Sequence, residues 1–402
     1  MQTTATSLFW IVLCSVLAPL VAGLVARKLV PEVVVLLALG VVVGPHMLDL
    51  AQTTEAIELL QQLGLGMLFL LAGYEIEFEE LTGPGGRRAC WTWLACLLTA
   101  LVAVWVIGLS GAVHAEVAVA IALTSTSLGT LLPILKDSGL LTSRVGATVM
   151  HHGAFGELGP IVAMATLLGT RGPVRSLLVL LLFAVIAAGV SLFAAQLRRE
   201  GSKLLELIRA GAETTGQTVV RLTMLLLVIL GVLATRFDLD VVLGAFAAGL
   251  VLRQLLPAGH ETLELRLTGL AFGFLIPVFF VTSGMAIDAA AVASEPVVLA
   301  VFVVLILGVR GGIVFVSERL HARRATSSGS GREAVSVALY AATGLPIIVA
   351  VTSTAVSAGE MSTTNASVLV AGGAITVLVF PLLATLLLGR REDDPTNEAA
   401  DS

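Results

Sequence analysis

One acidic residue lies in the middle of an apolar stretch, where a charge is costly. Glu157 is about eleven residues from either end of the segment 146–169. An ionisable group at the centre of a membrane helix costs on the order of 2.5–3.5 kcal/mol, and such groups by default mark ion or proton pathways. A carboxylate holds a proton or a metal ion on the same oxygens, but not both at once, so it can couple two ion fluxes. Glu157 is therefore our candidate for a shared proton and cation site.

A second charge, Arg310, lies inside the apolar segment 294–317. Its guanidinium stays protonated at any cellular pH, so it cannot carry an exchanged proton. We interpret Arg310 as a fixed positive charge that offsets negative helix ends or an empty Glu157. A purely structural salt bridge between Arg310 and Glu157 is the open alternative.

Composition indicates that these charges lie within a lipid bilayer. Of the 402 residues, 57% are hydrophobic and 13% are charged, whereas a soluble domain keeps about a quarter of its residues charged. A helix needs about 20 mainly apolar residues to span a bilayer, and thirteen such runs occur. The predicted spans are 8–26, 29–48, 57–76, 89–110, 114–135, 146–169, 174–197, 217–235, 238–256, 268–287, 294–317, 332–356 and 364–389.

The basic residues orient these predicted spans. With the N-terminus outside, nineteen of the 23 Lys and Arg residues fall in inside segments or at inner span ends, three fall on the outside, and Arg310 alone lies well within a span. Basic residues accumulate on the cytoplasmic side of membrane proteins. We therefore expect a multi-pass protein of the plasma membrane, with its N-terminus outside and its C-terminus in the cytoplasm.

Thirteen spans permit an inverted repeat, a common plan for secondary transporters. We predict an all-α integral membrane protein whose transporter domain covers residues 1–389. Spans one to six (8–169) and eight to thirteen (217–389) form the two repeats, joined by a linker span at 174–197. A short disordered cytoplasmic tail, 390–402, is expected to follow, with no C-terminal regulatory domain.

Two predicted spans carry helix-breaking residues near their middle. Small hydroxyls and Gly-x-Pro sequences release backbone groups that can line an ion site. These spans are the fifth of the first six and the fifth of the second six, and this correspondence points to a transporter site. Small residues are also common at helix contacts in lipid, which is the alternative for either span alone. The breaking residues are Thr124, Ser125, Thr126, Ser127 and Gly129 in the fifth span, and Thr343, Gly344 and Pro346 in the twelfth.

Other titratable residues have simpler interpretations. Glu75 and Glu77 lie at the inner end of the third predicted span, where interfacial water explains their charges. His151 and His152 share the sixth span with Glu157 but are not three or four residues from it, so they do not share its face. We interpret both histidines as helix-contact residues.

Several motifs together resemble the monovalent cation:proton antiporters of the Kef and NapA-like type. The motifs are LVPEVVVLLALGVVVGPHML, LGLGMLFLLAGYEIE, LTSTSLGTLLPILKDSGLL, LGAFAAGLVL and FLIPVFFVTSGMAID. Their order and spacing match this family from about residue 8 to residue 389. The resemblance implies a homodimer, with a core that carries two crossing broken helices and moves by alternating access.

The resemblance also assigns individual residues. It places Glu157 at the ion-binding acid of the sixth span, Arg310 at the basic residue of the eleventh span, and Thr126 and Ser127 at the unwound part of the fifth. The chain departs from the family at this acid, which is usually Asp preceded by Asp, Asn or Gln. Here the pair is Gly156 and Glu157.

These observations predict a secondary antiporter that exchanges a monovalent cation, Na⁺ or K⁺, for protons. One titratable acid beside a permanently charged arginine favours electroneutral exchange. Two alternatives stay open: a proton-coupled exporter of an organic or metal-complexed solute, and a non-transporting, ion-sensing homologue. The sequence contains no His/Asp metal cluster, nucleophile elbow or glycine-rich phosphate loop. We therefore expect no enzymatic activity, no cofactor, no metal beyond the transported cation and no nucleic-acid partner.

Overall fold

The computed structural model describes residues 4–24, 30–76, 81–109, 115–168, 173–199, 217–237, 239–255, 261–324 and 331–388. These residues form helices joined by turns and loops, and no strand occurs among them. The all-α prediction is confirmed for this part of the chain. The predicted tail, 390–402, and Glu77 lie outside the described residues.

Each predicted span coincides with one helix or with one interrupted helix. The single helices are α1 (Thr4–Leu24), α2 (Glu32–Val43), α3 (Glu55–Glu75), α5 (Pro84–Gly108), α8 (Arg144–Leu167), α9 (Pro173–Arg199), α11 (Thr218–Arg236), α12 (Val241–Leu255) and α20 (Thr363–Leu388). The helices interrupted by a loop are α6 (Glu116–Leu123) with α7 (Leu128–Asp137), and α18 (Gly331–Ala341) with α19 (Leu345–Ser357). A π-helical segment, η2 (Ala271–Leu275), joins α13 (Glu261–Leu270) to α14 (Ile276–Met285); after the short α15 (Ala289–Ser294), another, η3 (Ile306–Gly312), joins α16 (Pro296–Leu305) to α17 (Ile313–Arg324).

The surface of the bundle is suited to lipid. Seven helices in the described residues are long and apolar enough to cross a membrane. Helix α5, for example, exposes Trp91, Leu98 and Trp105, which recur every seven residues and so lie on one face. Exposing such an apolar stripe to water is unfavourable, whereas contact with lipid chains is not. The chain is a multi-pass membrane protein, while the total of thirteen spans stays a prediction.

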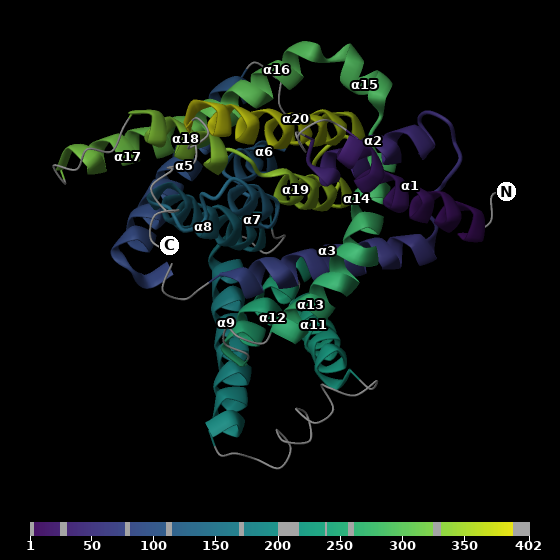
Figure 1. Cartoon of the computed structure of the whole chain (residues 1–402), viewed down its shortest axis with the longest axis horizontal. Coiled ribbons are helices and arrows are strands. Elements are labelled where there is room, and N and C mark those ends of the chain that lie inside the picture. Colours follow the sequence, from purple (N-terminus) through teal and green to yellow (C-terminus); the bar gives the residue numbers. More distant parts are fainter. Residues whose placement is uncertain are drawn as a thin grey trace, which may run out of the picture.

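The helices pack in two groups. The α3 group contains α1, α2, α3, α11, α12 and α14, and the α8 group contains α5, α6, α7, α8 and α16 to α20. In the view of Figure 1, α3, α11 and α12 lie in the lower half, and α18, α19 and α20 lie in the upper half. Helix α9, the predicted linker span, contacts α12 of one group and α8 of the other.

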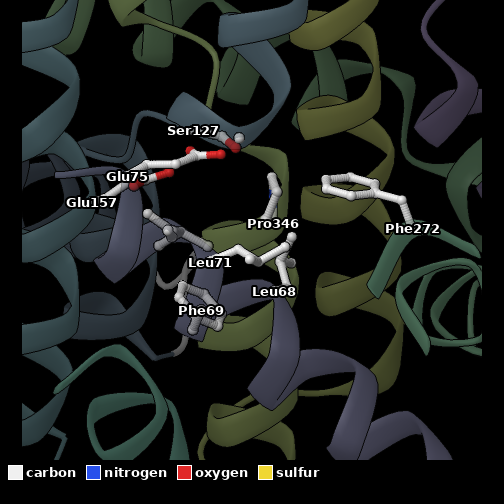
Figure 2. A pocket seen from close by; sticks show the side chains of 11 residues that line it. Leu68, Phe69, Leu71, Glu75, Ser127, Glu157, Phe272 and Pro346 are labelled. Atoms are coloured by element: carbon white, nitrogen blue, oxygen red, sulfur yellow. The ribbon is translucent and has the colours of Figure 1, made fainter. Parts of the chain in front are cut away.

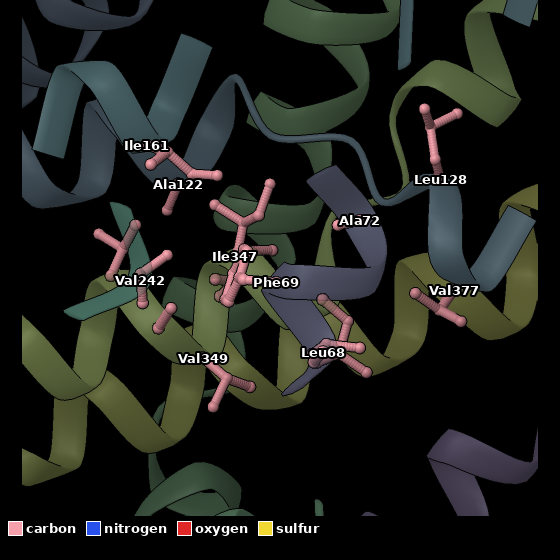
Figure 3. Packing of buried hydrophobic residues seen from close by; sticks show 14 of the residues in the cluster. Leu68, Phe69, Ala72, Ala122, Leu128, Ile161, Val242, Ile347, Val349 and Val377 are labelled. Atoms are coloured by element: carbon pink, nitrogen blue, oxygen red, sulfur yellow. The ribbon is translucent and has the colours of Figure 1, made fainter. Parts of the chain in front are cut away.

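Apolar packing continues across the boundary between the groups. Figure 3 shows Leu68 and Phe69 of α3 among Ile347 and Val349 of α19, and all four belong to one contiguous buried cluster. At this place, side chains of α3 and α19 therefore close the boundary between the two groups.

Glycines bring helix backbones of the α3 group into direct contact. A Cβ atom at Gly249 of α12 would lie 2.0 Å from the Leu70 carbonyl oxygen of α3, and one at Gly73 would lie 2.2 Å from the Phe246 carbonyl oxygen. Small residues at helix contacts allow this approach in lipid, where association depends on close van der Waals packing.

Replacing Gly249 with alanine should separate α3 from α12. We expect Gly249→Ala to lower the free energy of unfolding by about 1–3 kcal/mol, because the added methyl group overpacks a backbone contact. The measurement is thermal unfolding of the detergent-solubilised protein, followed by tryptophan fluorescence. Gly189→Ala on α9 is the matched control, since nothing lies within 4 Å of a Cβ atom there. Equal stability of the two variants would contradict the packing argument.

Candidate ion-binding site

The two helix breaks predicted from the sequence meet each other in the structure. The first break, Thr124–Ser127, separates α6 from α7, and the second, Ala342–Gly344, separates α18 from α19. The Ser127 amide donates to the Thr343 carbonyl oxygen across the crossing (2.6 Å). Backbone groups that leave each helix are thus satisfied by the other break.

The second break needs glycine because the first passes so close to it. A Cβ atom at Gly344 would lie 2.0 Å from Ser125 Oγ, which donates to the Gly344 carbonyl oxygen (3.3 Å). Pro346 follows in the first turn of α19, where its missing N–H is not needed by the helix. The structure places Ser125, Thr343 and Gly344 in the two helix breaks, and Pro346 in the first turn after the second break.

Arg310 lies behind this crossing and is completely buried. Its Nε and Nη2 atoms donate to Thr126 Oγ1 (3.1 and 3.0 Å), and Nη2 also donates to the His152 carbonyl oxygen (2.7 Å). The Thr126 hydroxyl in turn donates to the carbonyl oxygen of Ala341, the last residue of α18. The positive guanidinium thus faces the negative end of a helix through one hydroxyl group.

Arg310 and Glu157 do not form a salt bridge. The ion pairs among the described residues join His46 to Asp288, and Arg88 and His152 to Glu318. The salt-bridge alternative for Glu157 and Arg310 is therefore wrong, and the interpretation of Arg310 as compensation for helix ends fits its contacts.

Gly156 makes room for this arginine. A Cβ atom at Gly156 would lie 2.4 Å from Thr126 Oγ1 and 2.6 Å from Arg310 Nη2. The Gly156 carbonyl oxygen accepts from the Thr126 amide (2.9 Å). The space that a polar side chain would occupy before the acid is filled by the guanidinium and the threonine hydroxyl.

Glu157 has one satisfied oxygen and one without a partner. Its Oε1 atom accepts from the amide of Leu128, the first residue of α7 (2.7 Å). The N-terminus of a helix favours negative charge, so this contact supports the ionised carboxylate. The Oε2 atom is buried and has no hydrogen-bond partner among the described residues.

Glu157 lines a cavity between the two helix groups, together with a second acid (Figure 2). Its polar members are Glu75 of α3, Ser127 of the first break and Glu157 of α8. Figure 2 shows the two carboxylates and Ser127 on one side of the cavity and Phe272 on the other. The remaining lining is Leu68, Phe69, Leu71, Ala72, Gly129, Pro346 and Ile347.

The prediction that interfacial water solvates Glu75 is wrong. Its Oε2 atom is buried and, like that of Glu157, has no partner among the described residues. The continuous buried run Gly66–Tyr74, which precedes it, has no polar face. In a membrane protein an apolar helix can face either protein or lipid, so the sequence of α3 alone did not reveal that protein covers the end where Glu75 lies.

The geometry therefore sorts the predicted residues into two layers. Glu157, Ser127 and Pro346 line the cavity, whereas Thr126, Gly156 and Arg310 form a dry layer behind the crossing. Two carboxylates with unpartnered oxygens repel each other unless a proton or a cation lies between them. Such a pair beside crossing broken helices is the arrangement expected of a secondary ion transporter.

Comparison with known proteins identifies the family. The family described as "Sodium/hydrogen exchanger, transmembrane" matches residues 12–389. The chain belongs to this family.

Individual relatives are distant in sequence. The putative Na(+)/H(+) antiporter YjbQ of Bacillus subtilis is 23% identical over 321 residues, which cover 76% of this chain and 51% of that protein. The Na(+)/H(+)-K(+) antiporter GerN of Bacillus cereus is 26% identical over 286 residues, 69% of this chain and 70% of GerN. The chain thus spans about half the length of the first relative and more than two thirds of the second.

A solved structure shares the fold. The sodium proton antiporter MjNhaP1 from Methanocaldococcus jannaschii is 18% identical, with a TM-score of 0.64 over 96% of this chain and 98% of that structure. The predicted fold class is confirmed by this similarity.

The dry layer should depend on the Thr126 hydroxyl. Thr126→Val removes the acceptor of two Arg310 N–H groups, so we expect it to lower the free energy of unfolding by about 1–3 kcal/mol, the cost of leaving buried donors unsatisfied. Thr126→Ser keeps the hydroxyl and should unfold close to the wild-type temperature. Thermal unfolding in detergent measures both, and an equally unstable serine variant would contradict the hydrogen-bond explanation.

Proposed function

We propose that this protein is a secondary antiporter that exchanges a monovalent cation for protons, with Glu157 as the shared site. The observation that carries the proposal is the pair of unpartnered, buried carboxylate oxygens, Glu157 Oε2 and Glu75 Oε2, in one cavity. Carboxylate oxygens are typical ligands of hard cations. The family and the names of the relatives support the same activity.

The second acid changes the argument for electroneutral exchange. The premise of a single titratable acid does not hold, because Glu75 and Glu157 line the same cavity. Two neighbouring buried carboxylates cannot both be ionised without a counter-charge, so the empty pair keeps one proton. The pair then alternates between two protons and one proton plus one cation. Both states carry the same charge, so exchange is one for one.

The proposal includes the setting of the protein. It is a homodimer in the plasma membrane, with its N-terminus outside and its C-terminus in the cytoplasm. The distribution of basic residues supports this orientation. In Figure 1, α1 begins and α20 ends on opposite sides of the bundle, as an odd number of crossings requires. The homodimer rests on the family resemblance.

Exchange should depend on both acids. In everted vesicles, fluorescence dequenching after addition of Na⁺, K⁺ or Li⁺ reports cation-driven proton movement. We expect a signal for at least one cation, its loss in Glu157→Gln, and an apparent KM raised about tenfold or more in Glu75→Gln, because one oxygen ligand becomes neutral. Glu58→Gln, at an exposed position on the same helix as Glu75, is the matched control and should behave as wild type.

Silence of the inserted wild-type protein for all three cations would contradict the proposal. It would favour export of another solute or ion sensing without transport. Full activity of Glu157→Gln would show that Glu157 is not the ion-binding residue, although the protein would still be an antiporter.

One-for-one exchange predicts that the rate is insensitive to membrane potential. In proteoliposomes, Na⁺-driven proton movement should proceed at the same rate with and without a potential imposed by K⁺ and valinomycin, and should generate no potential of its own. A rate that follows the imposed potential would mean that the carboxylate pair releases both protons in each cycle.

A further inference from the structure

A second polar cluster lies apart from the cavity, among three helices of the α8 group. Arg88 Nη2 of α5 donates to Glu318 Oε2 of α17 (3.4 Å) and forms an ion pair with Glu318 Oε1 (3.1 Å). The same Oε1 atom contacts His152 Nε2 of α8 (2.9 Å). His152 is completely buried, and the side chains of Glu318 and Arg88 are 12% and 25% exposed. The exchange chemistry proposed above uses none of these three side chains.

Stability alone does not account for such a cluster. Replacing buried ion pairs with apolar side chains is often neutral or stabilising, because desolvation offsets the attraction. Their best-attested use is to fix one arrangement among several. The neighbouring contact between α5 and α17 is a simple hydroxyl pair, Thr92 Oγ1 to Ser317 Oγ (2.9 Å), which already joins these two helices.

His152 connects this cluster to Arg310 at the broken-helix crossing. Its side chain contacts Glu318, and its backbone carbonyl oxygen accepts from Arg310 Nη2 (2.7 Å). Arg310 lies in η3 and Glu318 lies in α17, which continues directly from η3. One residue of α8 therefore holds that helix at two points, on either side of the end of the π-helical segment.

The π-helical segment makes the second point of attachment necessary. A π-helical turn has more residues than an α-helical turn; such turns are rare and are frequently found at functional sites. Within η3, Arg310 is directed toward Thr126 and the crossing of the broken helices. Without an anchor beyond η3, the segment could relax to an α-helix and rotate the guanidinium away from Thr126.

We propose that Arg88, Glu318 and His152 are positioning residues that fix η3, and through it Arg310, at the crossing of the broken helices. Their effect on transport is transmitted through the hydrogen bonds from Arg310 to Thr126. This inference extends the proposed antiport function, but its structural part holds independently of which ion is carried.

The first test measures backbone hydrogen exchange of the full-length protein in detergent. Glu318→Ala should raise exchange at least several-fold in peptides that contain residues 124–128 and 306–312, since both lose the order imposed by Arg310. Glu318→Asp, which keeps the carboxylate, should restore most of the protection. The control Thr92→Val breaks the adjacent contact between α5 and α17 and should leave both peptides protected. Unchanged exchange in Glu318→Ala would overturn the proposal, whether or not the protein transports cations.

The second test is a double-mutant cycle on the rate of cation-driven proton movement. Glu318→Gln should lower the maximal rate about tenfold in the wild-type background and have little further effect in an Arg310→Lys background, because the two residues act through one contact. Independent, multiplicative effects of the two substitutions would show that the cluster does not act through Arg310. If the wild-type protein transports no cation, the proposed antiport function is refuted. The hydrogen-exchange experiment then tests by itself whether the three residues position Arg310.

Discussion

The arrangement of the site depends on one set of hydrogen bonds, those of the Arg310 guanidinium to Thr126 and to the His152 carbonyl oxygen. Two interrupted helices cross in a dry interior, and the α18 carbonyl group at the crossing carries partial negative charge. The guanidinium compensates that charge through Thr126 and, by filling the space beside Gly156, closes the layer behind the acid. Because Arg310 is committed to these contacts, it leaves Glu157 without an ion-pair partner. The acid is then available to a mobile ion.

The two carboxylate oxygens of Glu157 have different surroundings. One oxygen accepts from an amide at the start of α7, and the other is buried without a partner in a cavity that Glu75 also lines and whose other walls are mostly apolar. The amide favours the ionised form, and the second acid opposes it.

Much of this could be predicted from residue type and spacing. Thr124–Ser127 and Gly344 could be identified as helix breaks because helix-breaking depends on the residue types themselves. Glu157 could be identified because a carboxylate in the middle of an apolar helix is energetically costly. Glu75 was misjudged because distance from a span end measures depth along one helix, not the covering supplied by α8 and α19. The partner of Arg310 depended on how the eleventh and sixth segments face each other. The π-helical turn that decides this contains no proline, and its three glycines do not specify which way the arginine turns.

The two acids belong to different helix groups, Glu75 to the α3 group and Glu157 to the α8 group. Any displacement of one group against the other changes the separation of the carboxylates and hence the electrostatic energy of the pair. Ion occupancy and group position are then thermodynamically linked, and such linkage is reciprocal. A binder at the boundary between α3 and α19 that favours one position of the groups would therefore alter the affinity for the ion, even without touching either acid.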